Sequence, residues 1–198
     1  MPTAGASPNR TTDATHAATT LDGMAEAVVI PGGGYGVTTG MLWYAGEVAA
    51  RRGATVHRHS WTEPAPDAFD ATVETWVTAQ LAPTLTGRPL LIGKSLGSAA
   101  AALAADRGLP AVWLTPLLTA PWVVAALGRA TRPVLLVGGT ADRLWDGATA
   151  RRLTPHVVEV ADADHGLCVP GPMVGSVNVL ARVIAAMDEF LDAISWPG

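Results

Sequence analysis

The chain has 198 residues, of which 49% are hydrophobic and 15% are charged, and its formal net charge is −4. That length and apolar content are enough for one domain around one hydrophobic core. The acidic balance, with an isoelectric point near 5.6, argues against the basic patch of a nucleic-acid-binding protein. The single cysteine, Cys168, excludes an internal disulfide and a cysteine-rich zinc site. We expect no metal ion and no cofactor.

The first 23 residues are rich in threonine and alanine, and they lack the apolar core of a signal peptide. This composition predicts a disordered N-terminal tail over residues 1–23, followed by one domain over residues 24–198. The chain has no run of about 18 apolar residues, the length that a membrane span requires. We therefore expect a cytoplasmic protein that binds neither a membrane nor a nucleic acid.

From residue 25 onward, short apolar runs alternate with segments of helical periodicity. The apolar runs predict strands at residues 27–30, 54–61, 89–92, 111–114, 133–137 and 157–160. The periodic segments predict helices at residues 41–52, 70–81, 98–108, 122–127, 147–153 and 176–194. Strands separated by helices pair in parallel through right-handed crossovers, and apolar runs without polar alternation indicate burial on both faces. The sequence predicts an α/β fold, a three-layer α/β/α sandwich with a mostly parallel sheet of about six strands.

Two of the predicted helices have an apolar face. In the helix over 70–81, that face holds Val73, Trp76, Val77 and Leu81. In the long C-terminal helix, the residues predicted to face inward are Val177, Leu180, Ile184, Met187 and Leu191. Residues at this spacing share one side of a helix, so we expect both faces to pack inward.

The most informative segment is Gly93-Lys94-Ser95-Leu96-Gly97, which lies between an apolar run and an alanine-rich run. The pattern Gly-x-Ser-x-Gly between a strand and a helix is typical of a nucleophile elbow. Its glycines are needed because a Cβ at either position would collide with the crossing strand and helix, and the serine is held in a strained conformation. The alternative is a tight turn in which Ser95 only caps the helix.

Three further segments follow the predicted strands and would meet Ser95 at the same edge of the sheet. They are the glycine-rich run 32–36, the run 138–142 that ends in Asp142, and the loop that contains His165. A serine hydroxyl needs a base to take its proton, and the base needs a carboxylate to fix its tautomer. The chain order Ser95, Asp142, His165 is the order of an α/β-hydrolase triad.

Asp142 has competitors as the carboxylate partner. Asp162 and Asp164 lie on the same loop as His165, too near it in sequence for the usual geometry of separate strands. Asp146 lies further along the loop after residue 137 and is the best substitute. The position of Asp142 favours it over all three.

With these motifs, the chain resembles a small member of the α/β-hydrolase superfamily over residues 25–194, similar to dienelactone-hydrolase-like and compact esterase-like proteins. The resemblance implies an oxyanion hole made by the backbone N–H of Leu96 and one from the glycine-rich loop, either Gly34 or Tyr35. Two features depart from the family. Its first two antiparallel strands have no counterpart here, and its lid is reduced to the connection over residues 115–132.

The resulting hypothesis is a serine hydrolase that cleaves a small-molecule carboxylic ester or thioester. Trp43, Trp122 and Trp145 lie near the predicted site edge and are candidates for an apolar substrate pocket, although core packing is the alternative. An apolar rim without a lid would favour a homodimer. The same triad also serves lyases, cyclases and acyl transferases, and a non-catalytic binding protein of the same fold is the third possibility.

Overall fold

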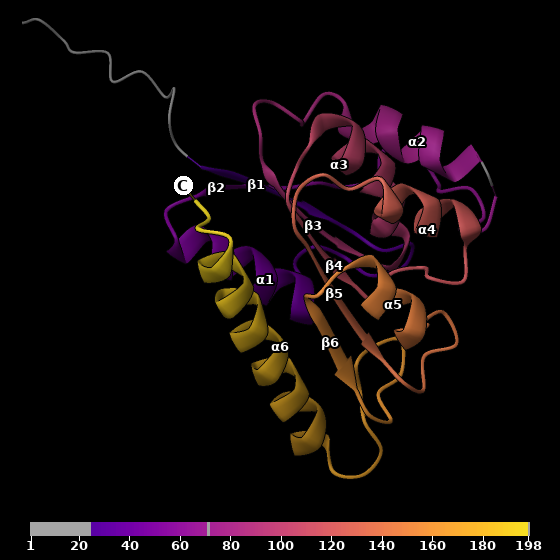
Figure 1. Cartoon of the computed structure of the whole chain (residues 1–198), viewed down its shortest axis with the longest axis vertical. Coiled ribbons are helices and arrows are strands. Elements are labelled where there is room, and N and C mark those ends of the chain that lie inside the picture. Colours follow the sequence, from indigo (N-terminus) through magenta and orange to yellow (C-terminus); the bar gives the residue numbers. More distant parts are fainter. Residues whose placement is uncertain (1–24, 71, 198) are drawn as a thin grey trace, which may run out of the picture.

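The structure is a computed structural model that describes residues 25–70 and 72–197, so the predicted tail over 1–23 lies outside it. Its centre is a sheet of six strands in the order β2-β1-β3-β4-β5-β6 (Figure 1). All pairings within this sheet are parallel. The strands are β1 (Glu26–Ile30), β2 (Thr55–Arg58), β3 (Leu90–Lys94), β4 (Ala111–Leu114), β5 (Val134–Gly139) and β6 (Val157–Val160). The predicted α/β class and strand number are confirmed.

Helices cover both faces of the sheet. They are α1 (Gly40–Arg51), α2 (Thr72–Leu81), the 3₁₀ helix η1 (Ser95–Ala100), α3 (Ala101–Arg107), α4 (Pro121–Gly128), α5 (Gly147–Leu153) and α6 (Met173–Ala193). In Figure 1, α1 and α6 lie on one side of the sheet and α2 to α5 lie on the other. Across the described ranges, no helix has the length and apolar character needed to cross a membrane.

The strands place two hydrophobic clusters on opposite sides of the sheet because successive side chains point to opposite faces. On β1, Val28 and Ile30 belong to the cluster under α2 to α5, whereas Ala27 and Val29 belong to the cluster under α1 and α6. All four are no more than 1% exposed. Burial on both faces explains why the strands read as continuous apolar runs in the sequence.

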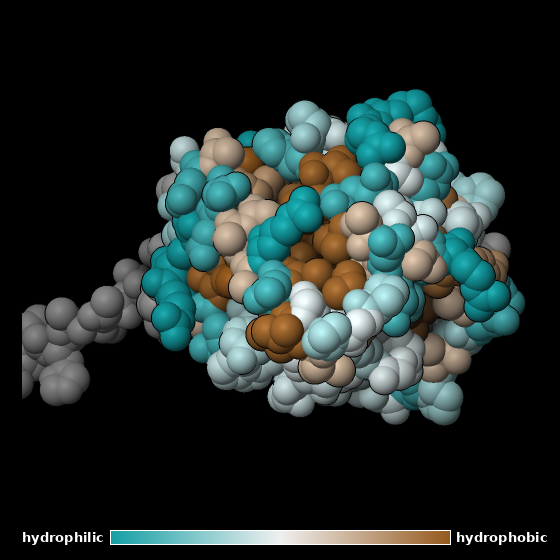
Figure 2. Space-filling view, turned by 90° about the horizontal axis from the view of Figure 1, so that it is seen from below, coloured by the Kyte–Doolittle hydropathy of each residue, from teal (hydrophilic) through white to brown (hydrophobic). Residues whose placement is uncertain are grey.

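The register brings the carboxyl ends of neighbouring strands level with one another. Lys94 at the end of β3 is paired with Leu114 at the end of β4, and Gly139 at the end of β5 is paired with Val160 at the end of β6. The loops that follow these strands therefore open at one edge. Figure 2 looks onto this edge, where apolar surface gathers near the middle of the face among hydrophilic residues.

Two strands differ in length from the prediction. Strand β2 ends at Arg58 rather than residue 61, because β2 lies at the sheet border and its only neighbour, β1, ends at Ile30. Strand β3 runs two residues further than predicted and ends at Lys94. The longer β3 buries Lys94 within the sheet rather than leaving it in a turn.

The predicted inward face of the C-terminal helix is partly wrong. Met187 and Leu191 are buried as expected, but Val177 is 55% exposed. The other buried residues of α6 are Val179, Val183 and Phe190. The first half of this helix carries apolar residues on two sides, so periodicity alone could not tell which side meets the sheet.

Candidate active site

The elbow has the strained geometry that its sequence predicts. Strand β3 ends at Lys94 and helix η1 begins at Ser95, whose φ of 51° lies in the left-handed region. A Cβ on Gly93 would lie 2.6 Å from the Trp113 ring on β4, and a Cβ on Gly97 would lie 2.9 Å from the Ile30 carbonyl oxygen on β1. Both glycines are therefore required for the close approach of strand and helix at this turn.

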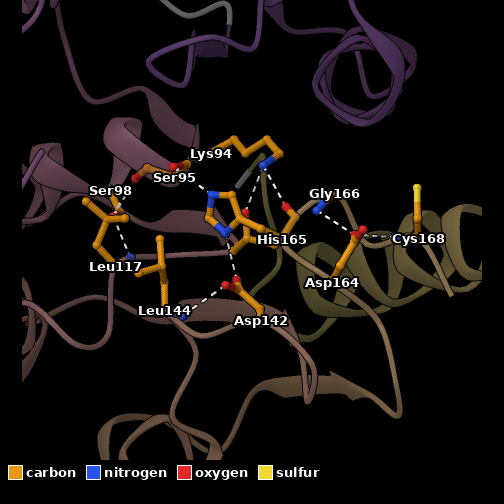
Figure 3. Close-up of polar contacts among 11 residues, drawn as sticks. Lys94, Ser95, Ser98, Leu117, Asp142, Leu144, Asp164, His165, Gly166 and Cys168 are labelled. Carbon is orange, nitrogen blue, oxygen red and sulfur yellow. Dashed lines mark hydrogen bonds and ion pairs between the residues drawn. The ribbon is translucent and has the colours of Figure 1, made fainter.

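Ser95, His165 and Asp142 form a continuous chain of hydrogen bonds (Figure 3). The Ser95 Oγ atom lies 2.8 Å from His165 Nε2, and His165 Nδ1 lies 2.7 Å from Asp142 Oδ2. The structure thus brings together three side chains from the loops after β3, β5 and β6. With the imidazole neutral and its proton on Nδ1, Nδ1–H donates to the carboxylate and Nε2 accepts from the serine hydroxyl.

Asp142 is held firmly in this arrangement. Its side chain is only 1% exposed, and its second oxygen, Oδ1, accepts a hydrogen bond from the backbone N–H of Leu144 at 2.9 Å. The competing carboxylates have other roles. Asp146 caps α5 by accepting from Ala148 and Thr149, and hydrogen bonds with Thr149 lower its pKa. Asp164 accepts from the backbone N–H groups of Gly166 and Cys168 and so shapes the histidine loop.

Lys94 belongs to this site, although the sequence predicted no role for it. Its side chain is buried, with the residue 3% exposed, and Nζ donates to Thr115 Oγ1 at 3.0 Å and to the His165 carbonyl oxygen at 2.9 Å. Nζ also lies 4.9 Å from the centre of the Tyr35 ring. Burial lowers the pKa of Lys94 from 10.5 to about 8, although the nearby carboxylates of Asp142 and Asp164 act in the opposite direction. The available signal was that this chain has no other lysine.

Ser98, directly after the elbow segment, is a second residue for which the sequence predicted no role at the site. Ser98 is completely buried, and its hydroxyl donates to the Ser95 carbonyl oxygen at 2.7 Å. The same hydroxyl accepts from the backbone N–H of Leu117 at 3.1 Å. Ser98 therefore ties the first turn after the elbow to the loop between β4 and α4.

The glycine-rich loop after β1 lies against the elbow. A Cβ on Gly33 would lie 3.8 Å from the Leu96 side chain, whereas a Cβ on Gly34 would meet no described atom within 4 Å. Because Gly33 lies against Leu96, its backbone N–H is a further candidate oxyanion donor beside those of Gly34 and Tyr35. The Tyr35 hydroxyl accepts from the Met41 backbone N–H at 3.0 Å. Leu96 is the second residue of η1, where backbone N–H groups lack an intrahelical partner.

A cavity of about 610 Å³ opens beside the histidine and its carboxylate partner. Its lining residues are Phe69, Ala141, Asp142, Arg143, Leu144, Asp164 and His165. Phe69 comes from the loop before α2 and is 53% exposed. Over the described ranges, no group of three or more histidine, cysteine or acidic side chains is arranged to hold a metal ion.

The three candidate pocket tryptophans occupy different places. Trp145 is a core residue: its ring packs over Gly138, and its Nε1–H donates to Glu159 at 2.8 Å, which corrects the pocket prediction for it. Trp43 is 40% exposed on α1 and packs edge-to-face against Tyr44. Trp122 is half-buried at the start of α4 against the core and remains a pocket candidate.

No protein-family model and no curated protein matches the chain, but solved structures do. Est1E from Butyrivibrio proteoclasticus, in a structure with ferulic acid bound, is 16% identical, with a TM-score of 0.63 over 86% of this chain and 89% of that one. XC6422 from Xanthomonas campestris, an α/β serine hydrolase without a lid, is 18% identical, with a TM-score of 0.54 over 86% and 81%. A monoacylglycerol lipase from Paleococcus ferrophilus is 17% identical, with a TM-score of 0.59 over 85% and 96%. This protein therefore has the α/β-hydrolase fold.

Proposed function

We propose that this protein is a serine hydrolase that cleaves a carboxylic ester or thioester. The observation that carries the proposal is the hydrogen-bonded chain from Ser95 Oγ through His165 to Asp142, with distances of 2.8 and 2.7 Å. Ser95 is pre-positioned on a strained turn at the open edge of the sheet. Because fold alone does not define a reaction, the proposal rests on this side-chain geometry.

The reaction proceeds through an acyl-enzyme. Ser95 Oγ attacks the substrate carbonyl carbon while His165 Nε2 accepts the hydroxyl proton, and Asp142 stabilises the resulting imidazolium. The tetrahedral intermediate expels the alcohol or thiol, which receives the proton from His165. Water then enters, gives a proton to His165 and attacks the acyl carbon. As the second intermediate collapses, the bond between the acyl carbon and Ser95 Oγ breaks, Oγ takes the proton back from His165, and the carboxylic acid is released.

The negative oxygen of each intermediate needs donors that are already in place. The backbone N–H of Leu96 serves as one donor, and one N–H from Gly33, Gly34 or Tyr35 serves as the other. Removal of one such donor typically costs about 3 kcal/mol of transition-state stabilisation. The cavity beside His165 accepts a small acyl or leaving group against Phe69 and Leu144.

The test is covalent labelling with a fluorophosphonate probe, followed by mass spectrometry of the labelled peptide. We expect the label on Ser95, and we expect Ser95→Ala to abolish both labelling and turnover of para-nitrophenyl butanoate. Cys168→Ser is the matched control, because Cys168 is an exposed nucleophile three residues after His165. Retained turnover in Ser95→Ala, or its loss in Cys168→Ser, would overturn the assignment.

Two further measurements define the reaction class. Turnover of matched ester and thioester substrates of equal acyl length identifies the preferred leaving group. Incorporation of oxygen from labelled water into the released acid supports hydrolysis, and its absence supports acyl transfer to another acceptor.

The homodimer predicted from the apolar rim stays a prediction, which the molecular mass in solution would test.

A further inference from the structure

Lys94 joins three segments that are far apart in the sequence. Its own strand, β3, leads directly into Ser95, Thr115 follows β4, and His165 lies in the loop after β6. The ammonium donates to Thr115 Oγ1 at 3.0 Å and to the backbone carbonyl of His165 at 2.9 Å, as Figure 3 shows for the histidine loop. The residue that precedes the nucleophile thus holds the backbone of the residue that carries the proposed base.

The charge at this position is not explained by an ion pair. Among the described residues, no carboxylate lies within 4.0 Å of Lys94 Nζ, and its two hydrogen-bond acceptors are neutral oxygens. The Tyr35 ring, 4.9 Å away, presents a π face rather than an anion. Burial of an ammonium group without an anionic partner opposes folding. A methionine has a similar length and would fill the same space without a charge, so packing does not require a lysine here.

We propose that Lys94 is a positioning residue that fixes His165 in reach of Ser95 during catalysis, an inference that rests on the proposed function. His165 must transfer a proton twice in each half-reaction, so Nε2 has to stay within hydrogen-bond distance of Ser95 Oγ, the leaving group and the attacking water in turn. The ammonium limits movement of the His165 backbone, and Thr115 limits movement of the ammonium.

The hydrogen bond from Lys94 Nζ to the His165 carbonyl oxygen weakens when Lys94 loses its proton. Hydrogen bonds from a charged donor are roughly twice as strong as those from a neutral one. The groups that face the ammonium are the Tyr35 ring from the β1–α1 loop, Asp142 from the loop after β5, and Asp164 and His165 from the loop after β6. Burial lowers the pKa of Lys94 to about 8, against the opposing effect of the Asp142 and Asp164 carboxylates. We therefore expect catalysis to decline severalfold between pH 7 and pH 10.

The test compares wild type with Lys94→Met in two assays. The first is the rate of Ser95 labelling by the fluorophosphonate, and the second is steady-state turnover of para-nitrophenyl butanoate corrected for spontaneous hydrolysis. For Lys94→Met we expect labelling and kcat to fall about 10- to 100-fold, as for other small displacements of a catalytic group. KM should change by less than threefold, and the alkaline decline of wild type should disappear.

Arg52→Met is the matched control, because Arg52 is another largely buried cation but lies between α1 and α6, away from the site. It should keep the wild-type kcat and pH profile at a temperature where it is folded. If Lys94→Met does not fold, Thr115→Val tests the same contact. That variant should lower kcat and move the alkaline decline to lower pH, because the ammonium loses an acceptor.

The outcomes separate this proposal from the one on which it rests. If wild type is not labelled at Ser95, the hydrolase assignment itself fails. If wild type is labelled and Lys94→Met matches its labelling rate, kcat and alkaline decline, Ser95 remains the nucleophile and the positioning role is wrong. Unchanged kcat and pH profile in Thr115→Val would overturn it equally.

Discussion

Lys94 and Arg52 are both largely buried cations, yet the protein compensates their charges in different ways. Arg52 lies at the end of α1, where its guanidinium is 3.1 Å from Asp188 and 2.8 Å from Asp192 on α6. It also donates to the backbone carbonyl oxygens of Asp188 and Trp196. Lys94 lies at the end of β3, and the acceptors of its ammonium are neutral.

The pKa values of the two groups move in opposite directions. The hydrogen bond with Asp192 is the largest cause that raises the pKa of Arg52, and burial is the cause that lowers the pKa of Lys94. Folding therefore favours the charged form of Arg52 and disfavours the charged form of Lys94. We infer that Arg52 stabilises the contact between α1 and α6. Lys94 instead serves the active site, and burial of its charge lowers the free energy of unfolding.

The largest expected effect comes from Asp142, one of the two carboxylates whose field favours the charged form of Lys94. In Asp142→Asn, an amide group would face His165 Nδ1 and favour the wrong tautomer of the imidazole. We expect kcat on para-nitrophenyl butanoate to fall about 10³- to 10⁴-fold. Because the Lys94 ammonium would also lose a favourable charge, any remaining alkaline decline should move to lower pH.

Asp146→Asn is the control for that prediction. Asp146 caps α5 through the N–H groups of Ala148 and Thr149, and asparagine is an equally good capping residue. Its kcat and its unfolding midpoint should stay close to wild type. A loss of activity in Asp146→Asn as large as in Asp142→Asn would move the carboxylate role away from Asp142.

The contrast between the triad and Lys94 also marks how far the sequence was predictive. Ser95, Asp142 and His165 could be assigned because each follows a predicted strand and the chemistry prescribes their types and order. The role of Lys94 could not, because it depends on Thr115 and Tyr35, which distant segments bring to the same place. A lysine between Gly93 and Ser95 reads as an ordinary exposed residue of a turn until β3 is seen to extend through it.

The sequence also did not determine which way some apolar side chains pack. Trp145 follows Asp142 closely and was a reasonable pocket residue, but the absence of a side chain on Gly138 lets its ring pack into the core. The two apolar sides of α6 likewise left its inward face undetermined. By contrast, the alternation of strands and helices was sufficient to predict the parallel sheet, because crossover connections allow few other arrangements.

The second prediction concerns the free-energy penalty of burying the charged Lys94 ammonium, which a change of pH can remove without a mutation. Below pH 8, both folded and unfolded chains carry the lysine proton, so the penalty is present in full. Between about 8 and 10.5 the folded protein releases this proton first, so the penalty disappears as pH rises. From pH 7 to pH 10, the free energy of unfolding of wild type should rise by about 2 to 3 kcal/mol relative to Lys94→Met.

Denaturant titrations of both proteins at the two pH values measure this difference. Parallel changes in wild type and Lys94→Met would show that the ammonium is not penalised by folding. The expected result pairs a gain in stability with a loss of catalysis over the same pH range. A residue needed only for the fold would instead lose stability and activity together.

The third prediction concerns Arg52, the cation whose charge is compensated by ion pairs with Asp188 and Asp192. Arg52→Met removes the bonds that join α1 to α6 and leaves two backbone carbonyl oxygens with fewer donors. We expect the free energy of unfolding at pH 7 to fall by about 1 to 2 kcal/mol, whereas Lys94→Met should be neutral or stabilising. Urea titrations of the two variants measure the contrast. If Lys94→Met proves the less stable of the two, the distinction between the two cations is wrong.

The smallest effect is expected at Arg129, a cation that remains exposed to solvent in the folded protein. Arg129, just after α4, lies 3.5 Å from Asp106, and their side chains are 52% and 68% exposed. An exposed pair of this kind gains little because water screens it and because holding two long side chains in one geometry opposes the attraction. Arg129→Met should change the free energy of unfolding by less than about 0.5 kcal/mol and leave kcat unchanged, as the same urea and turnover measurements will test. An effect as large as that of Arg52→Met would mean that burial does not explain the difference between Arg129 and Arg52.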